Sequence, residues 1–239
     1  MPGLSRVSII FPTLNEEKNI GATLDKAESF LKETFSWWEV IVVDNASTDK
    51  TLAIVDEARR DEPRIRLLRH LTNLGYAKST EDGLHAAKGD FIFIIDSDGQ
   101  HDIKDVVPFI QKLKSGDGLV VGWKRKRNDP LSRLVMAKGY NALFRLLFGG
   151  RLHDVDCGFK GYSKALAKRL RVEYHNVPVG AEICAKAQRM GFRIGEIEVK
   201  HFARKGGRSS FHPLKMPVTI TKIFWSLFVL RWRLRDTKS

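Results

Sequence analysis

Short apolar runs alternate with amphipathic segments along residues 1–122. Four of the five residues at 7–11 are apolar, and 91–95 are apolar throughout, the pattern of buried strands. Similar runs predict strands at 39–43, 64–68 and 118–122, and helical spacing predicts helices at 19–34, 48–60, 77–87 and 103–114. Strands that alternate with helices predict an α/β fold with a doubly wound, mostly parallel sheet. Such sheets bind ligands beyond the carboxyl ends of their strands.

The pattern changes at Lys124, where the basic run Lys-Arg-Lys-Arg begins. Beyond it we expect an amphipathic helix at 131–148, a polar, glycine-containing loop at 154–162, a helix at 181–190 and a strand at 194–202. These elements predict a layer built onto the first sheet. We therefore expect one domain at 1–210, with halves at 1–122 and 123–210, and a separate C-terminal helix within 211–239.

Composition and charge narrow the classes of protein that fit. The chain has 239 residues, of which 43% are hydrophobic, so it can bury a core and is not generally disordered. Two cysteines are too few for a disulfide framework or a four-cysteine zinc site. Residues 1–100 carry 12 Lys and Arg against 17 Asp and Glu, whereas residues 101–239 carry 29 against 11. The basic second part predicts an anionic partner: nucleic acid, a phosphorylated ligand or a membrane surface.

Two polar loops follow the first two predicted strands. Pro12-Thr-Leu-Asn-Glu-Glu has no glycine and carries two carboxylates, which argues against a dinucleotide-binding turn, and the chain has no P-loop motif. Asp44-Asn-Ala-Ser-Thr-Asp-Lys-Thr places a carboxylate where a base or a ribose hydroxyl can donate to it. Capping of the next helix by these side chains is the alternative in both loops.

A third loop, Asp96-Ser-Asp-Gly-Gln-His, follows the fully apolar strand at 91–95. Two carboxylates at this spacing offer the oxygen ligands that Mg²⁺ or Mn²⁺ prefers. Such an ion would bridge the two phosphates of a nucleotide diphosphate. A plain acidic turn is the alternative, since Asp-Gly is a common turn pair.

These three loops together resemble those of the family 2 glycosyltransferases. The resemblance rests on P-x-x-N-E, D-x-x-S-x-D-x-T, D-x-D-G-Q and a later C-G-F-K, and it extends from about residue 7 to residue 210. The chain is most similar to the branch of dolichyl-phosphate mannose and glucose synthases. That branch implies a GT-A fold and inverting transfer of a hexose from a nucleotide-diphosphate sugar to a polyprenyl phosphate at the cytoplasmic leaflet.

The resemblance also implies roles for individual residues. The residues expected around the nucleoside are Pro12, Asn15, Glu16 and Asp44. The residues expected to hold the metal and diphosphate are Asp96, Asp98 and Gln100. The segment 154–160 resembles the acceptor loop, residues 204–209 resemble the R-x-x-G-x-S motif, and Glu182 matches an acidic position. Cys157-Gly-Phe-Lys resembles the glucose branch more than the mannose branch, so the expected donor is GDP-mannose or UDP-glucose.

The basic residues suit a phosphorylated acceptor. We expect Lys124, Arg125 and Arg204 to pair with acceptor or donor phosphate. Asp154 or Glu182 would touch sugar hydroxyls, and no general base is needed because the phosphate is already mostly dianionic at pH 7. Two alternatives remain: a family 2 transferase that acts on a saccharide hydroxyl, and a basic nucleic-acid-binding protein. The second is disfavoured because no nucleic-acid module is recognisable.

The C-terminal segment predicts attachment to a membrane surface. Residues 214–235 combine leucines and aromatic residues with a closing series of arginines, the composition of an interfacial helix. The longest apolar stretch, 15 residues at 216–230, is shorter than the about 20 that span a bilayer, and the N-terminus lacks a signal-peptide core. We expect a peripheral protein on the cytoplasmic face, with packing on the protein or a dimer contact as the alternative.

Overall fold

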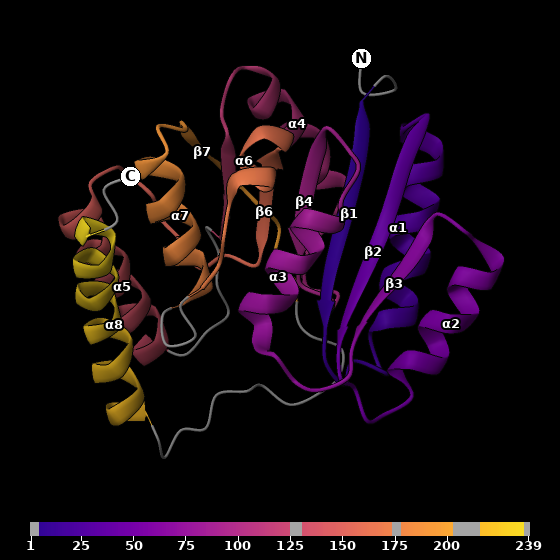
Figure 1. The fold of residues 1–239 in the computed structure, drawn as a ribbon, viewed down its shortest axis with the longest axis horizontal. Helices are drawn as coiled ribbons and strands as arrows, with labels where there is room; N and C mark the ends of the chain where they lie inside the picture. The colour runs from indigo at the N-terminus through magenta and orange to yellow at the C-terminus, as the bar shows by residue number, and fades with distance from the viewer. Residues whose placement is uncertain (1–4, 125–130, 174–177, 203–215, 237–239) are drawn as a thin grey trace.

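A single twisted sheet forms the centre of the molecule, with helices on both faces (Figure 1). The computed structural model describes residues 5–124, 131–173, 178–202 and 216–236. The strands are β1 (Arg6–Thr13), β2 (Trp37–Asn45), β3 (Ile65–His70), β4 (Phe91–Ile95), β5 (Leu119–Trp123), β6 (Phe159–Ser163) and β7 (Ile194–Glu198). The helices are α1 (Ile20–Thr34), α2 (Thr51–Asp61), α3 (Gly75–Ala86), the short η2 (Ile103–Asp105), α4 (Val106–Lys114), α5 (Leu131–Phe148), α6 (Lys164–Arg169), α7 (Val179–Arg189) and α8 (Met216–Asp236).

The strand order is β3-β2-β1-β4-β6-β5-β7. β6 is antiparallel to both of its neighbours, β4 and β5, and every other neighbouring pair is parallel. This confirms the predicted mostly parallel sheet. α1 and α2 pack together on one face, and α3 and α6 on the other. The central strands are buried on both faces, which explains why β4 is apolar at every position.

The expected loop at 154–162 is wrong in its second part, because β6 begins at Phe159. β6 inserts between β4 and β5 and is antiparallel to both. Its sequence, Phe-Lys-Gly-Tyr-Ser, has only two large apolar residues. Gly161 is required by packing, because a Cβ there would meet the ring of Phe93 at 2.8 Å. A central strand with a lysine and a glycine does not have the apolar pattern that identified the other strands.

The predicted strand at 194–202 is also shorter than expected. β7 ends at Glu198, and the chain then runs beside the loop that follows β4, where His201 forms an isolated antiparallel bridge with His101. The Phe202 N–H donates to the Gln100 carbonyl at 2.9 Å. This contact brings the end of the described segment to the edge of the sheet that carries the carboxylates of Asp96 and Asp98.

α8 packs against α5 and α7 and is apolar on two sides. Leu227 and Leu230 are fully buried, and the ring of Phe224 contacts that of Tyr140 edge-on. On the outer side Trp225 and Trp232 are 68% and 64% exposed. Within the part of the chain that the structure describes, no helix combines the length and the apolar character needed to cross a bilayer.

Candidate active site

Polar loops from several strands meet at one edge of the sheet. β1 to β4 run parallel, so the segments that follow Thr13, Asn45, His70 and Ile95 lie at the edge where these strands end, the lower edge in Figure 1. β6 is antiparallel, so it begins at this edge, with Phe159 paired to Ile95. Residues at the start of β6 therefore join those at the ends of the other strands.

The loops after β1 and β2 are fastened to each other. Asn15 has φ 55°, a left-handed conformation that asparagine tolerates, and its Oδ1 accepts from Thr48 N at 2.8 Å. Its own N–H donates to Ser47 Oγ at 2.9 Å. Asp44 is fully buried and accepts from Ser47 N at 3.2 Å. Asn15 and Asp44, both predicted to surround a nucleoside, therefore shape the loops that form this part of the edge.

A cavity of about 470 Å³ lies beside these loops and is called here the β1–β3 cavity. Two of the residues predicted to surround a nucleoside, Pro12 and Glu16, line it, and so do Asp96 and Asp98. Asn15 and Asp44 are not among its lining residues. The structure thus brings four of the predicted residues together around one cavity.

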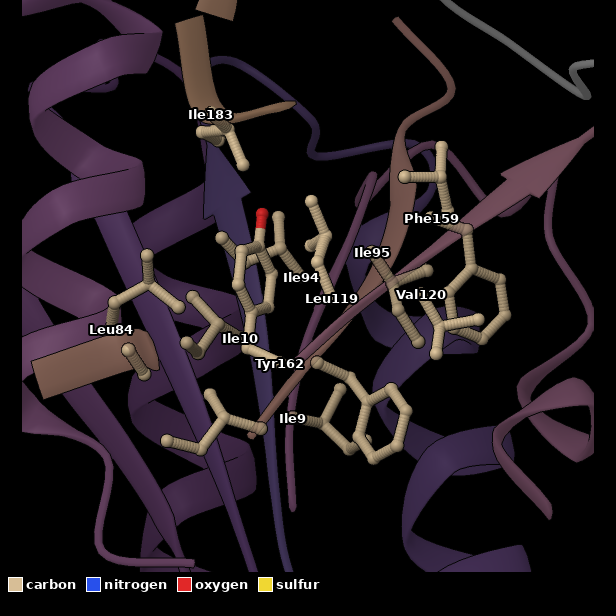
Figure 2. Packing of buried hydrophobic residues seen from close by; sticks show 14 of the residues in the cluster. Ile9, Ile10, Leu84, Ile94, Ile95, Leu119, Val120, Phe159, Tyr162 and Ile183 are labelled. Carbon is tan, nitrogen blue, oxygen red and sulfur yellow. The ribbon is translucent and has the colours of Figure 1, made fainter. Parts of the chain in front are cut away.

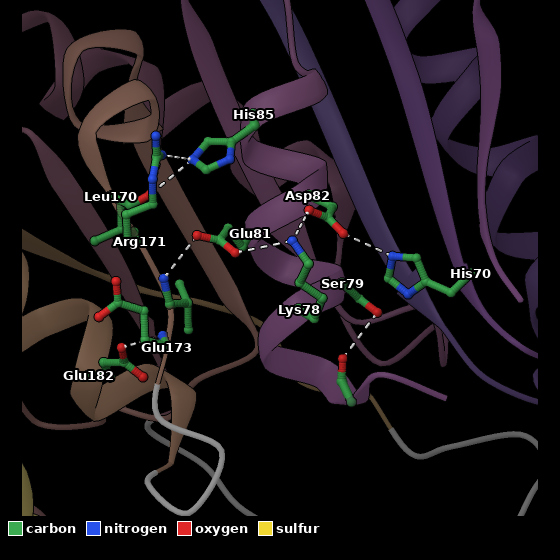
Figure 3. A network of polar contacts seen from close by, with 12 residues as sticks. His70, Lys78, Ser79, Glu81, Asp82, His85, Leu170, Arg171, Glu173 and Glu182 are labelled. Atoms are coloured by element: carbon green, nitrogen blue, oxygen red, sulfur yellow. Dashed lines mark hydrogen bonds and ion pairs between the residues drawn. The ribbon is translucent and has the colours of Figure 1, made fainter. Parts of the chain in front are cut away.

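Three lining residues of the β1–β3 cavity were missed from sequence: Asn45, Asn73 and Tyr76. Asn45 Oδ1 accepts from Leu74 N at 2.8 Å, and its Nδ2 donates to Asn73 Oδ1 at 2.8 Å. The Asn45 Oδ1 also contacts the buried ring of His70, whose Nε2 lies 3.0 Å from Asp82 of α3, as Figure 3 shows for His70 and Asp82. The signal was available, because residues 71–76 follow the third predicted strand at the same edge.

Asp96 and Asp98 lie in a tight turn at the end of β4. Gly99 has φ 74°, the left-handed region that favours glycine, and Gln100 N donates to Asp98 Oδ1 at 3.1 Å. The Tyr76 hydroxyl donates to Asp96 Oδ1 at 3.1 Å. Burial, followed by the negative charge of Asp98, raises the pKa of Asp96 to about 6, while the nearby Lys124 ammonium opposes this rise.

This turn suits a divalent cation that also binds phosphate. Among the described residues, no three His, Cys, Asp or Glu side chains are grouped to hold a metal by themselves. Asp96 and Asp98 offer two carboxylates that repel each other, and a cation would relieve that repulsion. Mg²⁺ and Mn²⁺ accept such a partial set when substrate phosphates supply the remaining oxygen ligands. The donor set therefore fits a metal held jointly by protein and nucleotide.

A second cavity, of about 320 Å³, lies where β6 begins and is called here the β6 cavity. It is lined by residues of α3, β4, β6 and the N-terminal end of α7, and three of them carry charge: Asp96, Asp156 and Lys160. Lys160 is buried, and its Nζ donates to the Cys157 carbonyl. Asp156 is exposed at this wall of the cavity. Asp156 and Lys160 belong to the predicted acceptor loop, but neither was singled out from sequence.

The acidic residues predicted to touch sugar hydroxyls do not line either cavity. Asp154 is buried at 6% exposure. Glu182 is fully buried in α7, pairs with Lys186 at 2.8 Å and accepts from Glu173 N at 2.8 Å, the contact drawn in Figure 3. The Glu182 carboxylate is engaged in an internal ion pair, and the contact of Asp154 or Glu182 with sugar hydroxyls stays a prediction.

The predicted phosphate-binding residues are partly described. Lys124 follows β5 and is close enough to oppose the rise in the pKa of Asp96. Arg125 and Arg204 lie outside the described residues. Gln100 Nε2 donates to the Phe202 carbonyl at 3.0 Å, which links the loop after β4 to the end of the described segment at Phe202.

Comparisons with known proteins agree with this geometry. The model of the family "Glycosyl transferase family 2" matches residues 8–171. A dodecaprenyl-phosphate galacturonate synthase of Rhizobium johnstonii is 28% identical over 96% of this chain and 68% of its own length. A dolichyl-phosphate beta-glucosyltransferase of Trichomonas vaginalis is 27% identical over 99% of this chain and 78% of its own.

Solved structures share the fold at lower identity. The crystal structure of glucosyl-3-phosphoglycerate synthase from Mycobacterium tuberculosis in complex with Mn²⁺ and UDP-glucose matches with a TM-score of 0.70 and 21% identity. The match covers 95% of this chain and 79% of that one. The likeness places the seven-stranded sheet among GT-A-like folds, as the sequence predicted.

Proposed function

Since this chain belongs to glycosyltransferase family 2, we propose that it transfers a hexose, mannose or glucose, from a nucleotide-diphosphate sugar to a polyprenyl phosphate. The observation that carries the proposal is the position of Asp96 and Asp98. Both carboxylates border the β1–β3 cavity, and Asp96 also borders the β6 cavity. A nucleotide in the first cavity would place its diphosphate at the two carboxylates. The names of the Rhizobium and Trichomonas relatives support a polyprenyl phosphate acceptor.

The donor would be held by groups from several strands. Pro12, Glu16, Asn45 and Asn73 form the wall of the β1–β3 cavity against the nucleoside. Asp96 and Asp98, with Gln100 beside them, would hold a divalent cation, Mg²⁺ or Mn²⁺. When bound, such an ion would supply positive charge to offset the charge that develops on the leaving diphosphate.

The acceptor needs little activation. A phosphate monoester has its second pKa near 6, so at pH 7 it is mostly a dianion and already nucleophilic. One of its oxygens attacks the anomeric carbon, the bond from that carbon to the diphosphate breaks, and the nucleoside diphosphate leaves. The configuration at the anomeric carbon of the transferred sugar is thereby inverted. The protein's task is to align the two phosphates in line and offset their repulsion. Lys124 is placed for this task, and Arg125 and Arg204 stay candidates for it.

The outer side of α8 supports attachment to a membrane surface, and we propose that this surface is the cytoplasmic face. Trp225, Phe228 and Trp232 are exposed together on one helix, and Arg231, Arg233 and Arg235 are exposed near its end. Aromatic rings beside cations suit the headgroup region of an anionic bilayer. An acceptor drawn from that bilayer would reach the enzyme phosphate first.

The experiment that tests the function is a transfer assay with purified protein. GDP-mannose, UDP-glucose and other nucleotide sugars are each offered with Mg²⁺ or Mn²⁺ and one of three acceptors: polyprenyl phosphate, polyprenol or an oligosaccharide. We expect glycolipid only from polyprenyl phosphate, and we expect Asp98→Asn or excess chelator to abolish it. Asp90→Asn, an exposed acid paired with Lys164, is the matched control. Transfer to the oligosaccharide alone would refute the proposal, and full activity in chelator would refute the metal's role.

A further inference from the structure

The two cavities at the sheet edge adjoin each other. Tyr76 and Asp96 line both of them, and the Tyr76 hydroxyl donates to Asp96 at 3.1 Å. A nucleotide in the β1–β3 cavity whose diphosphate lies at Asp96 and Asp98 therefore directs its next group into the β6 cavity. In a nucleotide-diphosphate sugar that group is the sugar.

The β6 cavity presents two hydroxyls that have no partner in the structure. Thr80 and Tyr162 are both fully buried, both line the cavity, and the described residues offer no hydrogen bond to Thr80 Oγ1 or to the Tyr162 hydroxyl. Figure 2 shows the Tyr162 hydroxyl directed toward Ile183, beside Ile94, and both isoleucines also line the cavity. A buried hydroxyl without a partner is costly, by about 1–3 kcal/mol. A polyhydroxylated ligand would satisfy both groups.

The charges on the wall favour one class of sugar. Asp156 is fixed against the first turn of α7, because the Ala181 N–H donates to it and a Cβ at Gly180 would meet its Oδ1 at 2.5 Å. Lys160 is already engaged by the Cys157 carbonyl. Among the described residues that line the cavity, Asp156 is thus the carboxylate left without the proposed cation, and Lys160 supplies the one ammonium. A sugar hydroxyl can donate to Asp156, whereas a sugar carboxylate would meet a like charge.

We propose that the β6 cavity holds the hexosyl group of the donor, and that Asp156, together with Thr80 and Tyr162, selects a neutral hexose over a hexuronate. This inference rests on the proposed function, since it assigns the sugar of the same donor. It also separates this chain from its galacturonate-transferring relative, which shares 28% of its residues.

The test compares donors and variants in two measurements. Transfer is followed with UDP-glucose, GDP-mannose and UDP-galacturonate, and binding of each donor is compared with binding of UDP or GDP alone by calorimetry. Wild type should prefer the neutral hexose donors. Asp156→Asn should lower kcat/KM for the neutral hexose about tenfold to a hundredfold, the cost of a charge-assisted hydrogen bond. It should also narrow the discrimination against UDP-galacturonate at least tenfold and leave the affinity for UDP and GDP unchanged.

Two further variants keep the result interpretable. Tyr162→Phe and Thr80→Val each remove only a hydroxyl group. Both should weaken the binding of the nucleotide sugar and leave the binding of UDP or GDP unchanged. Asp90→Asn should match wild type in every measurement. Folded variants that bind and discriminate donors as wild type does would overturn the inference, as would a wild type that prefers UDP-galacturonate. If wild type transfers none of the sugars to polyprenyl phosphate, the proposed function fails instead, and the calorimetric comparison still decides where the sugar binds.

Discussion

Adding one methyl group at Gly158 should displace the carboxylate of Asp96, the proposed metal ligand, without removing it. Gly158 begins the approach of the chain to β6, and its carbonyl accepts from Asp96 N at 3.1 Å. A Cβ at this position would lie 1.8 Å from Asp96 Oδ2 and 2.3 Å from Asp96 Cγ. The φ of Gly158 is not in the left-handed region, so an alanine is not strained by its backbone. The whole effect of Gly158→Ala therefore falls on Asp96.

The size of the effect follows from the distances. Ordinary van der Waals contact begins at 3.4 Å. The Asp96 carboxylate must therefore move away by about 1.6 Å, or the backbone segments at residues 96 and 158 must move apart. A misplacement of about 1 Å in a catalytic group costs about a hundredfold in rate. Overpacking of this kind costs about 1–3 kcal/mol in the free energy of unfolding. We expect metal-dependent transfer to fall about a hundredfold in a protein that still folds.

The assay measures transfer at saturating metal alongside denaturant unfolding. Gly21→Ala is the matched control, because its Cβ meets only Ile54 Cγ2, at 3.4 Å, inside α1. That control should keep full activity and gain about 0.5–1 kcal/mol, the usual preference of a helix for alanine. Activity of Gly158→Ala within threefold of wild type would show that Asp96 need not stand where the structure places it.

Three further outcomes are expected. Trp225→Ser combined with Trp232→Ser should abolish flotation with anionic liposomes while circular dichroism stays unchanged, and flotation as strong as that of wild type would contradict a membrane role for α8. Hydrogen bonds from Arg64 lower the pKa of Glu62 from 4.5 to about 2, so Glu62 stabilises the fold above pH 4.5 and this contribution is lost as pH falls toward 2. Glu62→Gln should cost about 1 kcal/mol at pH 7 after allowance for the exposed partners, and equal stabilities at pH 7 in urea unfolding would refute this. Lys186→Met removes the ammonium that pairs with the buried Glu182 carboxylate and should cost about 3–5 kcal/mol in the same measurement, whereas a loss under 1 kcal/mol would not fit.

The sequence predicted those strands whose burial leaves an uninterrupted or nearly uninterrupted run of apolar residues. β4 is apolar at all five positions because both of its faces are covered, and β1 shows nearly the same signature. β6 is equally central but contains Lys160, which lines a cavity, and Gly161, whose missing side chain leaves room for the Phe93 ring. Neither its existence nor its antiparallel direction could be inferred from periodicity.

The site was predictable where position along a strand decides it. Asp96 and Asp98 follow a strand parallel to the predicted strand that precedes Pro12 and Glu16. Because the carboxyl ends of parallel strands meet at one edge of a sheet, the sequence alone predicts that these residues lie together. Glu182 and Lys186 stand four residues apart in α7, so their pairing could be read from the sequence. The burial of these two charges depends on how α7 packs against the rest of the protein, which a linear pattern does not encode.

The place of β6 in the sheet has a consequence for dividing the protein. β4 and β5 are never neighbours, because a strand that comes about 40 residues after β5 along the chain separates them. A fragment ending at residue 122 would keep β4 and most of β5 but lose β6 and β7, which opens one edge of β4 and both edges of β5. Such a fragment should aggregate rather than bind nucleotide. Fragment exchange between relatives should therefore cut the chain after Ser163, which keeps β4, β6 and β5 together and leaves open only the edge of β5 that pairs with β7.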